Sequence, residues 1–268
     1  MIIRYNIPFS RSRKIARSYC KMVQLLLRPF ISRRFLKNID GNSIDYLDIP
    51  VIINNYNRVN HLKQLIEWLE NAGMRNIFII DNASTFPPLL EYYKSTRHTI
   101  IGLSANIGYK SLWDTNIHLW FKGLPYIYTD SDVLPVEVCP GDVVKKFQDI
   151  LEKYPQFTKV GFGIKIDDLP HHYKNKQNVI QWESKFWSTH IGDGLYKADI
   201  DTTFALYRAN SVKQQWGKTL RTSGNYMIRH LPWYENESEI NDEEKYYRAV
   251  AVSSTWYSAK WQKKYGST

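Results

Sequence analysis

The sequence predicts an α/β protein, with a mostly parallel sheet flanked by helices and a basic helical segment in front of it. Short apolar runs of strand length alternate with stretches of helical periodicity, which is typical of parallel βαβ units. The apolar runs end in polar residues, and basic charge is concentrated near the N-terminus. With 268 residues, the chain can bury one large core. We expect an N-terminal segment over residues 1–47 and one domain over residues 48–268.

The N-terminal segment is strongly basic. Residues 1–40 contain ten Lys and Arg and one acid, a net charge of +9 within a whole-chain charge of +10. Apolar side chains recur at helical spacing over residues 15–30, and Pro29 ends or kinks that helix. A basic amphipathic helix suits an anionic membrane surface, which residues 10–37 would contact. Docking of its apolar stripe on the domain is the alternative. A basic arm also suits nucleic acid, but no nucleic-acid motif accompanies it, so we expect no such partner.

Cysteine usage and hydropathy indicate the compartment. The two cysteines, Cys20 and Cys139, lie far apart and form no disulfide framework, so a reducing compartment is expected. No apolar run reaches the length of about 18 residues that a transmembrane helix needs. We therefore expect a cytoplasmic protein, held peripherally on the inner face of the plasma membrane by its basic segment.

The alternating elements begin after residue 48. Strands are expected over residues 49–53, 76–80, 99–103, 124–129 and, later, 203–207. Helices are expected between the first four of these strands, around residues 62–69, 87–93 and 110–120. Gly73 follows the first helix as its stop signal, and Pro87 begins the second. Such βαβ units close with a right-handed crossover.

Polar residues follow each of the first four strands: Asn54, Asp81, Asn106 and Asp130. Because the carboxyl ends of parallel strands meet at one edge, these side chains would gather along the crevice where α/β sheets bind ligands. The chain has neither a G-x-G-x-x-G fingerprint nor a Walker-type P-loop, which disfavours nicotinamide and P-loop enzymes. A diphosphate bound here would need a metal ion instead of a glycine-rich cradle.

Asp130-Ser131-Asp132 is the strongest candidate for that metal site. Two carboxylates one residue apart at a strand end repel each other unless a cation or water separates them. Mg²⁺ or Mn²⁺ prefers oxygen ligands and would bridge to a substrate diphosphate. An isolated Asp-x-Asp is more often a solvated turn, so its surroundings decide between the two interpretations.

Four stretches in register over residues 49–135 resemble a GT-A glycosyltransferase, closest in style to the bacterial family 2-like group. They are PVIINNYNR at 50–58, IDNAST at 80–85, NIG at 106–108 and YTDSD at 128–132. The resemblance implies a GT-A (Rossmann-like) fold. Residues 48–135 would form the nucleotide-sugar-binding half, and residues 136–268 the acceptor-binding half.

The resemblance also assigns roles in the donor site. It implies that Asp81 hydrogen-bonds the nucleoside base and that Asn54 and Asn106 line the same pocket. Asp130 would face the ribose or the metal, and Asp132 would bind the metal directly. For Asp81 the structural alternative is an Asx-turn or a helix N-cap.

Two later residues complete the predicted donor site. The stretch HLPW at 230–233 resembles the histidine-containing element with which several GT-A families supply a further metal ligand, which would make His230 a ligand. A structural hydrogen bond is the alternative role for His230. Arg221 precedes a Thr-Ser-Gly sequence, a candidate mobile loop, from which its guanidinium could clamp the diphosphate. A surface salt bridge is the alternative for Arg221.

The catalytic base is less clearly marked. Family 2 members usually offer an acidic pair on a later helix, and this chain has no clean equivalent. Asp201 is the first candidate, since it precedes the strand expected over residues 203–207, and a general base must come within about 3 Å of the acceptor hydroxyl. Asp199 lies on the same side of an extended chain and stays open. Further candidates are Glu183, Glu235 and Glu237.

The expected activity is metal-dependent transfer of a monosaccharide from a nucleotide-diphosphate sugar, with a UDP-sugar favoured, to a hydroxyl of a glycan or lipid-linked glycan in surface polysaccharide synthesis. A carboxylate base implies inversion; without one, a retaining route stays open. A sugar-nucleotide nucleotidylyltransferase is an alternative, although residues 54–58 lack the glycine-rich loop of such enzymes. A non-catalytic carbohydrate- or nucleotide-binding protein is another. The acidic stretch over residues 235–244 is expected to be solvated surface.

Overall fold

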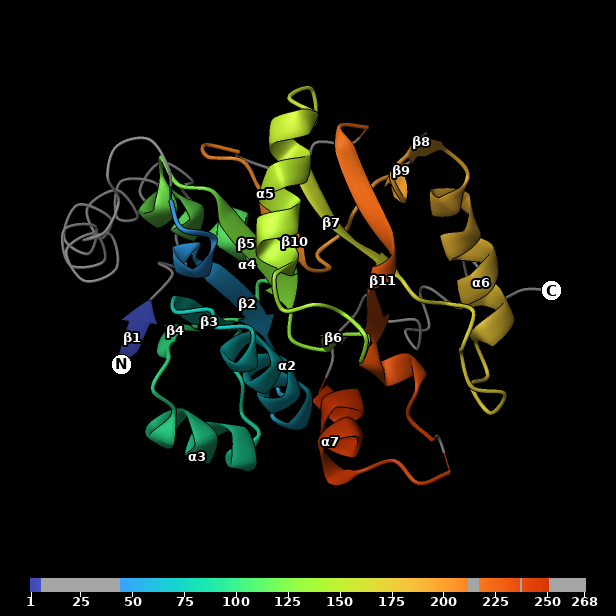
Figure 1. Ribbon diagram of the computed structural model, residues 1–268. Coiled ribbons are helices and arrows are strands. Elements are labelled where there is room, and N and C mark those ends of the chain that lie inside the picture. Colours follow the sequence, from blue (N-terminus) through green and yellow to red (C-terminus); the bar gives the residue numbers. More distant parts are fainter. Residues whose placement is uncertain (6–43, 212–216, 237, 251–268) are drawn as a thin grey trace.

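The computed structural model describes residues 1–5, 44–211, 217–236 and 238–250 (Figure 1). Within these residues one mixed sheet of eleven strands has the order β1-β4-β3-β2-β5-β10-β7-β11-β9-β8, with β6 paired to β11. Its first half is parallel throughout and comprises β1 (Ile2–Tyr5), β2 (Val51–Asn55), β3 (Ile77–Asp81), β4 (Thr99–Leu103) and β5 (Tyr126–Asp130). The predicted α/β class, with helices flanking the sheet, is confirmed. The predicted N-terminal helix lies outside the described residues.

Apolar side chains on both faces of the sheet explain why its strands read as continuous hydrophobic runs. Val51 and Ile53 pack into a core beneath α2 (Asn60–Asn71), α3 (Pro87–Ser95) and α5 (Val143–Lys153). Ile52 between them points to the opposite core, against α4 (Ser111–Asp114) and the 3₁₀ turn η2 (Ile117–Phe121). Figure 1 shows α2 and α5 on the near side of the sheet. Helices on both faces leave the strand ends as the accessible part of the sheet.

Two elements differ from the prediction. The helix expected over residues 110–120 is divided into α4 and η2, because Asn116 between them adopts a left-handed backbone conformation, with φ of 63°. Residues 2–5, expected in a separate basic segment, form β1 and pair in parallel with β4. The sheet therefore begins inside the segment predicted over residues 1–47.

The second half of the chain extends the sheet in mixed fashion. Its strands are β6 (Val133–Pro135), β7 (Lys159–Ile164), β8 (His190–Gly192), β9 (Leu195–Lys197), β10 (Ala205–Tyr207) and β11 (Thr219–His230). β10 runs antiparallel between β5 and β7, whereas β11 is parallel to β7 with a register shift between Thr222 and Met227. Its helices are α6 (Lys176–Ser184) and α7 (Asp242–Val250), and the short 3₁₀ turns are η1 (Tyr46–Asp48), η3 (Lys185–Trp187) and η4 (Leu231–Trp233).

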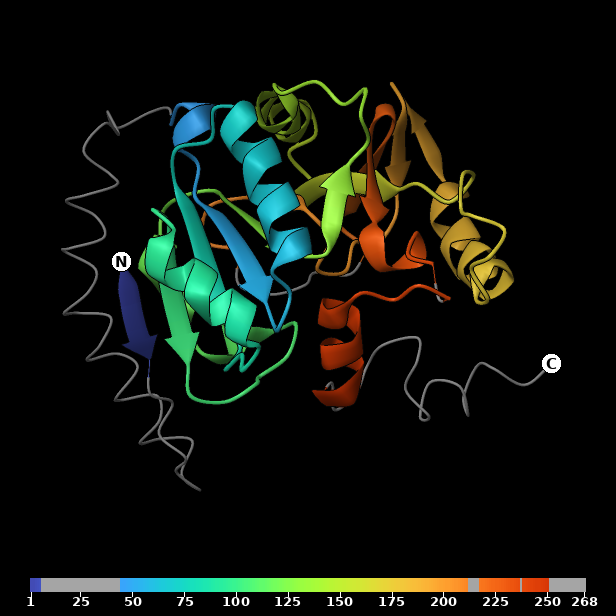
Figure 2. The same cartoon turned by 90° about the horizontal axis from the view of Figure 1, so that it is seen from below.

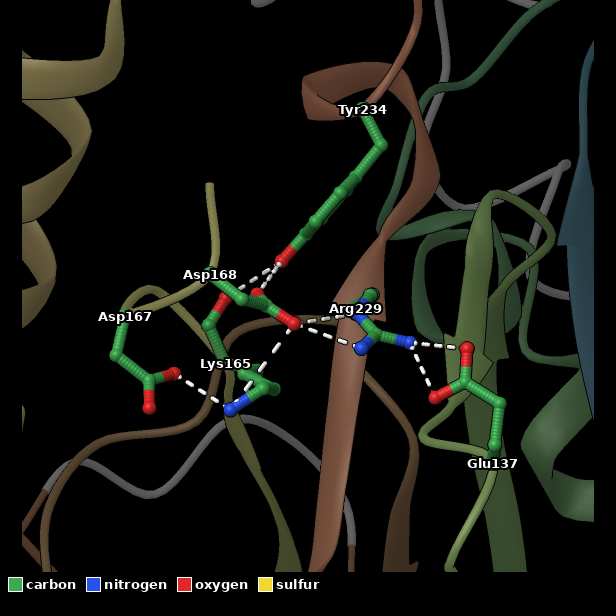
Figure 3. Close-up of polar contacts among 6 residues, drawn as sticks. All are labelled: Glu137, Lys165, Asp167, Asp168, Arg229 and Tyr234. Carbon is green, nitrogen blue, oxygen red and sulfur yellow. Dashed lines mark hydrogen bonds and ion pairs between the residues drawn. The ribbon is translucent and has the colours of Figure 1, made fainter. Parts of the chain in front are cut away.

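Arg229 anchors the C-terminal part of β11 to two loops. Its guanidinium contacts Glu137, after β6, at 2.6 Å and Asp168, after β7, at 2.7 Å. The hydroxyl of Tyr234 donates to Asp168 at 2.6 Å. Figure 3 shows Arg229 between the two carboxylates, with Lys165 reaching the same loop. These contacts hold the segment that precedes η4 and carries His230.

The last described helix returns to the first half of the sheet. Seen from below, α7 lies beside the carboxyl end of β2 and the start of α2 (Figure 2). Phe86 and Tyr246 pack with their ring centroids 4.9 Å apart, and Tyr246 donates to Thr85 at 3.0 Å. The carboxyl edge of the parallel strands is therefore covered in part by α7. No helix in the described part of the chain is both long and apolar enough to cross a membrane.

Candidate functional site

Asn54 joins the polar strand ends to one another. The parallel register of β2 and β5 places it beside Asp130, and its Nδ2 donates to Asp130 Oδ1 at 3.1 Å. Its Oδ1 accepts from Asn82 Nδ2 at 2.6 Å and from Ser111 Oγ at 2.7 Å. The structure thus brings Asn54 and Asp130 into direct contact at the carboxyl edge.

Asp130 is held from a second side by the segment before β10. Its backbone N–H donates to Thr202 O at 2.9 Å, and the Thr202 hydroxyl donates to Oδ2 of its carboxylate. Both carboxylate oxygens of Asp130 therefore accept protein hydrogen bonds. Burial, assisted by the charge of Asp132, raises the pKa of Asp130 despite these bonds. Asp132 is the better placed of the two to act as an ionised ligand.

Asp132 faces His230, as the predicted metal site requires. Its Oδ2 lies 3.6 Å from His230 Nε2, and its carbonyl accepts from Leu231 N at 2.8 Å. Burial raises the pKa of Asp132, but His230, Arg58 and His61 outweigh it and lower the pKa overall. Burial also lowers the pKa of His230 and so favours the neutral imidazole that binds metals. A carboxylate and an imidazole are therefore brought together.

The carboxylate of this pair suits Mn²⁺ or Mg²⁺, and the imidazole favours Mn²⁺, because Mg²⁺ prefers oxygen ligands and retains several waters. No group of three or more His, Cys, Asp or Glu side chains in the described part of the chain is arranged to hold a metal. A cation would therefore take Asp132 and His230 as its protein ligands and complete its shell with water or phosphate oxygens. Asp130 is held by Asn54 and Thr202, and its role as a further metal ligand stays a prediction.

Asp81 lies at the end of β3 and is 7% exposed. Its Oδ2 accepts from Ser84 N at 3.2 Å and its Oδ1 from the Tyr93 hydroxyl at 3.1 Å. Burial raises the pKa of Asp81, although these hydrogen bonds oppose the shift. The contact with Ser84 matches the structural alternative of a local turn. A contact with a nucleoside base stays a prediction.

Asn106 is exposed, and its Oδ1 accepts from Gly108 N at 2.8 Å. Asn82 instead links this loop to Asn54, because its Oδ1 accepts from Ile107 N at 3.1 Å. Sequence reasoning missed this role, although Asn82 directly follows Asp81 in the IDNAST stretch. Asn82 therefore makes the side-chain contact with Asn54. The pocket-lining role of Asn106 stays a prediction.

The predicted diphosphate clamp, Arg221, is buried, with 2% of its surface exposed. It pairs with Glu183 at 2.7 Å, and its Nε donates to Asp199 O at 2.9 Å. Its guanidinium lies 4.0 Å above the Phe186 ring. This placement contradicts the clamp role, because β11 points Arg221 into the packing between the sheet and η3. Glu183 is committed to the same pair, so the structure does not favour it as a base.

Asp201 is exposed and directly precedes Thr202, the hydroxyl donor to Asp130. Its charge contributes to the raised pKa of Asp130, which places it at the same edge. Asp199 instead accepts from Gly217 N at 2.7 Å. Asp201 therefore adjoins the residue that holds Asp130, whereas Asp199 is bound to the backbone of Gly217. Glu237 lies outside the described residues.

The acidic stretch over residues 235–244 is not solvated surface, so that expectation is wrong for three of its members. Glu243 and Glu244 are 2% and 1% exposed. Glu244 pairs with Arg58, and Glu235 lies 3.0 Å from His61 Nε2. The spacing of Glu243 and Glu244 on a short helix gave no signal of this burial, since their cationic partners lie in the first half of the chain.

No protein-family model matches the chain, and no curated protein matches its sequence.

Proposed function

We propose that this protein is a metal-dependent glycosyltransferase of the GT-A type that transfers a monosaccharide from a nucleotide-diphosphate sugar, preferably a UDP-sugar, to a hydroxyl acceptor. The main support is the juxtaposition of Asp132 and His230, which are 3.6 Å apart although they come from distant parts of the chain. Both lie at the carboxyl edge of a parallel sheet, where α/β folds bind ligands. The sequence has no glycine-rich phosphate loop, so a diphosphate bound here would need a metal ion. Asp132 and His230 would hold that ion.

Side chains of the chain itself supply the remaining roles. Asn54 and Thr202 hold Asp130 in place, which fixes the turn that presents Asp132. Asp201 accepts the proton of the acceptor hydroxyl as the oxygen attacks the sugar, and the diphosphate leaves from the opposite face. This in-line arrangement inverts the anomeric centre. Mn²⁺ or Mg²⁺ on Asp132 and His230 would supply positive charge to the departing diphosphate.

The acceptor and the location are part of the same proposal. A basic segment over residues 10–37 fits a glycan or lipid-linked glycan acceptor at an anionic membrane surface. We place the enzyme in the cytoplasm, peripheral to the inner face of the plasma membrane. This part rests on sequence alone.

Isothermal calorimetry of UDP and of GDP, each with and without Mn²⁺, tests the donor site. We expect one nucleotide to bind only with Mn²⁺, and Asp132→Ala and His230→Ala each to weaken that binding by about tenfold or more. Asp149→Ala is the matched control, because Asp149 is 57% exposed on α5 in a surface pair with Lys145. Metal-independent nucleotide binding, or equal binding in Asp132→Ala, would contradict the proposal.

Transfer activity separates an enzyme from a binding protein. Once the nucleotide is known, its sugar conjugates are incubated with the protein and release of the nucleoside diphosphate is measured. We expect Asp201→Asn to lower kcat by about 10²-fold or more while the nucleotide affinity is retained. Asp199→Asn is the matched comparison and should retain most activity. Nucleotide binding without any sugar release would favour a non-catalytic role.

A further inference from the structure

Two glutamates of α7 are buried against a set of positive groups at the start of α2. Glu243 Oε2 accepts from the backbone N–H groups of Val59 at 2.6 Å and Asn60 at 2.7 Å. Glu244 forms an ion pair with Arg58. These N–H groups lie at the N-terminus of a twelve-residue helix, where free amides and the helix dipole favour an anion. The site therefore holds two carboxylates supplied by the protein itself.

The carboxylates do not satisfy all the donors that surround them. Arg58 Nε is a buried donor with no hydrogen-bond partner, and His61 Nδ1 is likewise buried and unpartnered. The other ring nitrogen of His61, Nε2, faces Glu235 Oε1 at 3.0 Å, so Nδ1 is a further donor only in the protonated ring. The side chains of Arg58 and His61 are only 4% and 6% exposed. His61 Nδ1 points toward Glu243 Oε1 at 3.9 Å, too far for a hydrogen bond, and that oxygen also lacks a partner. A larger anion with more acceptor oxygens would fit these donors better.

The site also adjoins the proposed metal pair. Burial opposes the charge of Arg58, but the carboxylates of Asp132 and Glu244 outweigh it and raise the pKa of the guanidinium. Tyr247 packs on Arg58 with the guanidinium carbon 3.9 Å from the ring centroid. An anion bound by Arg58 would therefore lie within the influence of both Asp132 and a metal beside it. Arginine is also the side chain best shaped for phosphate.

We propose that Arg58, His61 and the first amides of α2 form a binding site for a diphosphate group, and that Glu243 and Glu244 occupy this site until the diphosphate displaces them. This inference rests on the proposed function for the source of the diphosphate, the nucleotide sugar, and it assigns to Arg58 the task first predicted for Arg221. A buried guanidinium without an anion is strongly unfavourable, so exchange of one anion for another keeps it paired throughout. α7 then acts as an internal competitor of the donor.

The test uses inorganic pyrophosphate with the full chain in EDTA, so that neither nucleotide nor metal contributes. We expect the Glu243→Gln/Glu244→Gln double variant to bind pyrophosphate about tenfold more tightly than the wild type, because no internal anion has to be displaced. Asp242→Asn on the same helix is the matched control. Asp242 is 91% exposed in its pair with Lys245, so its removal should leave the affinity unchanged. Equal or weaker binding in the double variant would overturn the inference.

Two further measurements guard against a folding defect. Arg58→Gln/Glu244→Gln removes both partners of the buried pair and so leaves no uncompensated charge. We expect it to melt cooperatively and to lose pyrophosphate binding. Hydrogen exchange of the wild-type amides over residues 242–250 should accelerate on addition of pyrophosphate. Retained binding in the Arg58 variant, or protection of α7 by pyrophosphate, would contradict displacement.

The outcomes for this inference and for the proposed function are separable. Pyrophosphate binding in EDTA that persists in Asp132→Ala supports the anion site whatever the metal does. In the presence of Mn²⁺, competition by UDP for the same site identifies the diphosphate as that of the nucleotide. Pyrophosphate binding that UDP does not displace would support the anion site and contradict the nucleotide as its source.

Discussion

Lys159 is a buried ammonium group on β7, with 2% of its surface exposed. Its Nζ donates to Ile200 O at 2.6 Å and to the Tyr207 hydroxyl at 3.2 Å. Burial lowers its pKa to about 7, even though Asp201 and Asp199 oppose that shift. Its carbonyl partner precedes the segment that carries Asp201, so Lys159 helps to fix the backbone beside the proposed base.

Lys159 should make stability depend on pH above neutrality. The unfolded chain keeps this lysine protonated up to about pH 10.4, whereas the folded chain releases the proton near pH 7. The unfolded state therefore binds more protons between these values, and the free energy of unfolding should rise with pH by up to about 1.4 kcal/mol per unit. Urea denaturation at pH 7, 8 and 9 measures this slope. Lys159→Met should lack this contribution, whereas Lys145→Met, at a lysine 59% exposed, should keep it. Parallel wild-type and Lys159→Met curves would contradict the assignment.

At this scale the sequence predicted Asn54 and Asp130 at one edge because they follow parallel strands, and the structure brings the two into contact. The resemblance added Asp132 and His230, which lie 3.6 Å apart. Arg58 and His61 were missed. A basic residue directly after a strand forms no recognisable sequence motif. The contacts of Arg58 and His61 are made with Glu243 and Glu244, which lie far along the chain. Arg221 was misassigned because the direction of a side chain on β11 depends on which strands pair with it.

At the scale of elements, β11 connects the sheet to the site. Its register shift against β7 accommodates residues 223–226, after which the strand pairs with β6 and ends at His230. Gly163 on β7 lies beneath this region, where a Cβ atom would meet Thr222 O at 2.5 Å and the Trp187 ring at 2.2 Å. The register shift in β11 therefore requires a residue without a side chain at position 163 of the neighbouring strand β7. The sequence pattern predicted no strand at β7, whose two glycines interrupt the apolar pattern.

Arg229 should be needed to hold the end of β11 in place. Arg229→Met removes the contacts with Glu137 and Asp168 shown in Figure 3 and should lower the free energy of unfolding by about 1–2 kcal/mol. Burial raises the pKa of Asp168, but hydrogen bonds from Tyr234 and Arg229 outweigh it and lower the pKa overall. The stabilisation is therefore present above about pH 4 and lost as pH falls through the folded pKa. Urea titrations at pH 7 and pH 3 should show a smaller difference between variant and wild type at pH 3 than at pH 7. An equal loss at both values would indicate lost packing instead of lost charge pairing.

At the scale of the whole molecule, β1 protects an edge of the sheet. Residues 2–5 pair with β4, and Tyr5 donates to Thr115 O at 3.0 Å and packs on Trp120. Without β1, the N–H and C=O groups of β4 would face solvent as a template for pairing with another chain. An unpaired edge strand affects the whole molecule, because it can pair with a second molecule and cause self-association.

Removal of residues 1–5 should therefore cause self-association and a loss of stability. We expect a larger species in multi-angle light scattering and a free energy of unfolding reduced by about 3 kcal/mol from the buried Tyr5 ring alone. Arg4→Ala is the control, because Arg4 is exposed and the strand is kept. A truncated chain that stays monomeric and melts as the wild type does would show that β1 is dispensable.

The architecture of the first half was predictable because each strand and each helix carries its own local signal. Every strand expected in residues 49–129 is present within about two residues of its predicted bounds. β1 was not predictable, since four residues in a basic context form a strand only when an edge is available. The order of strands in the second half depends on long-range pairing that no local pattern records.

The pairing of Arg58 with α7 has a consequence for biosynthesis. Translation is vectorial, so β2 and α2 leave the ribosome long before Glu243 and Glu244 are made. During that interval the guanidinium lacks its ion-pair partner Glu244, and the nascent first half cannot bury it without penalty. Cellular phosphate compounds could serve as temporary counter-ions at this stage. The concentration of such metabolites would then influence how efficiently the newly synthesised chain folds.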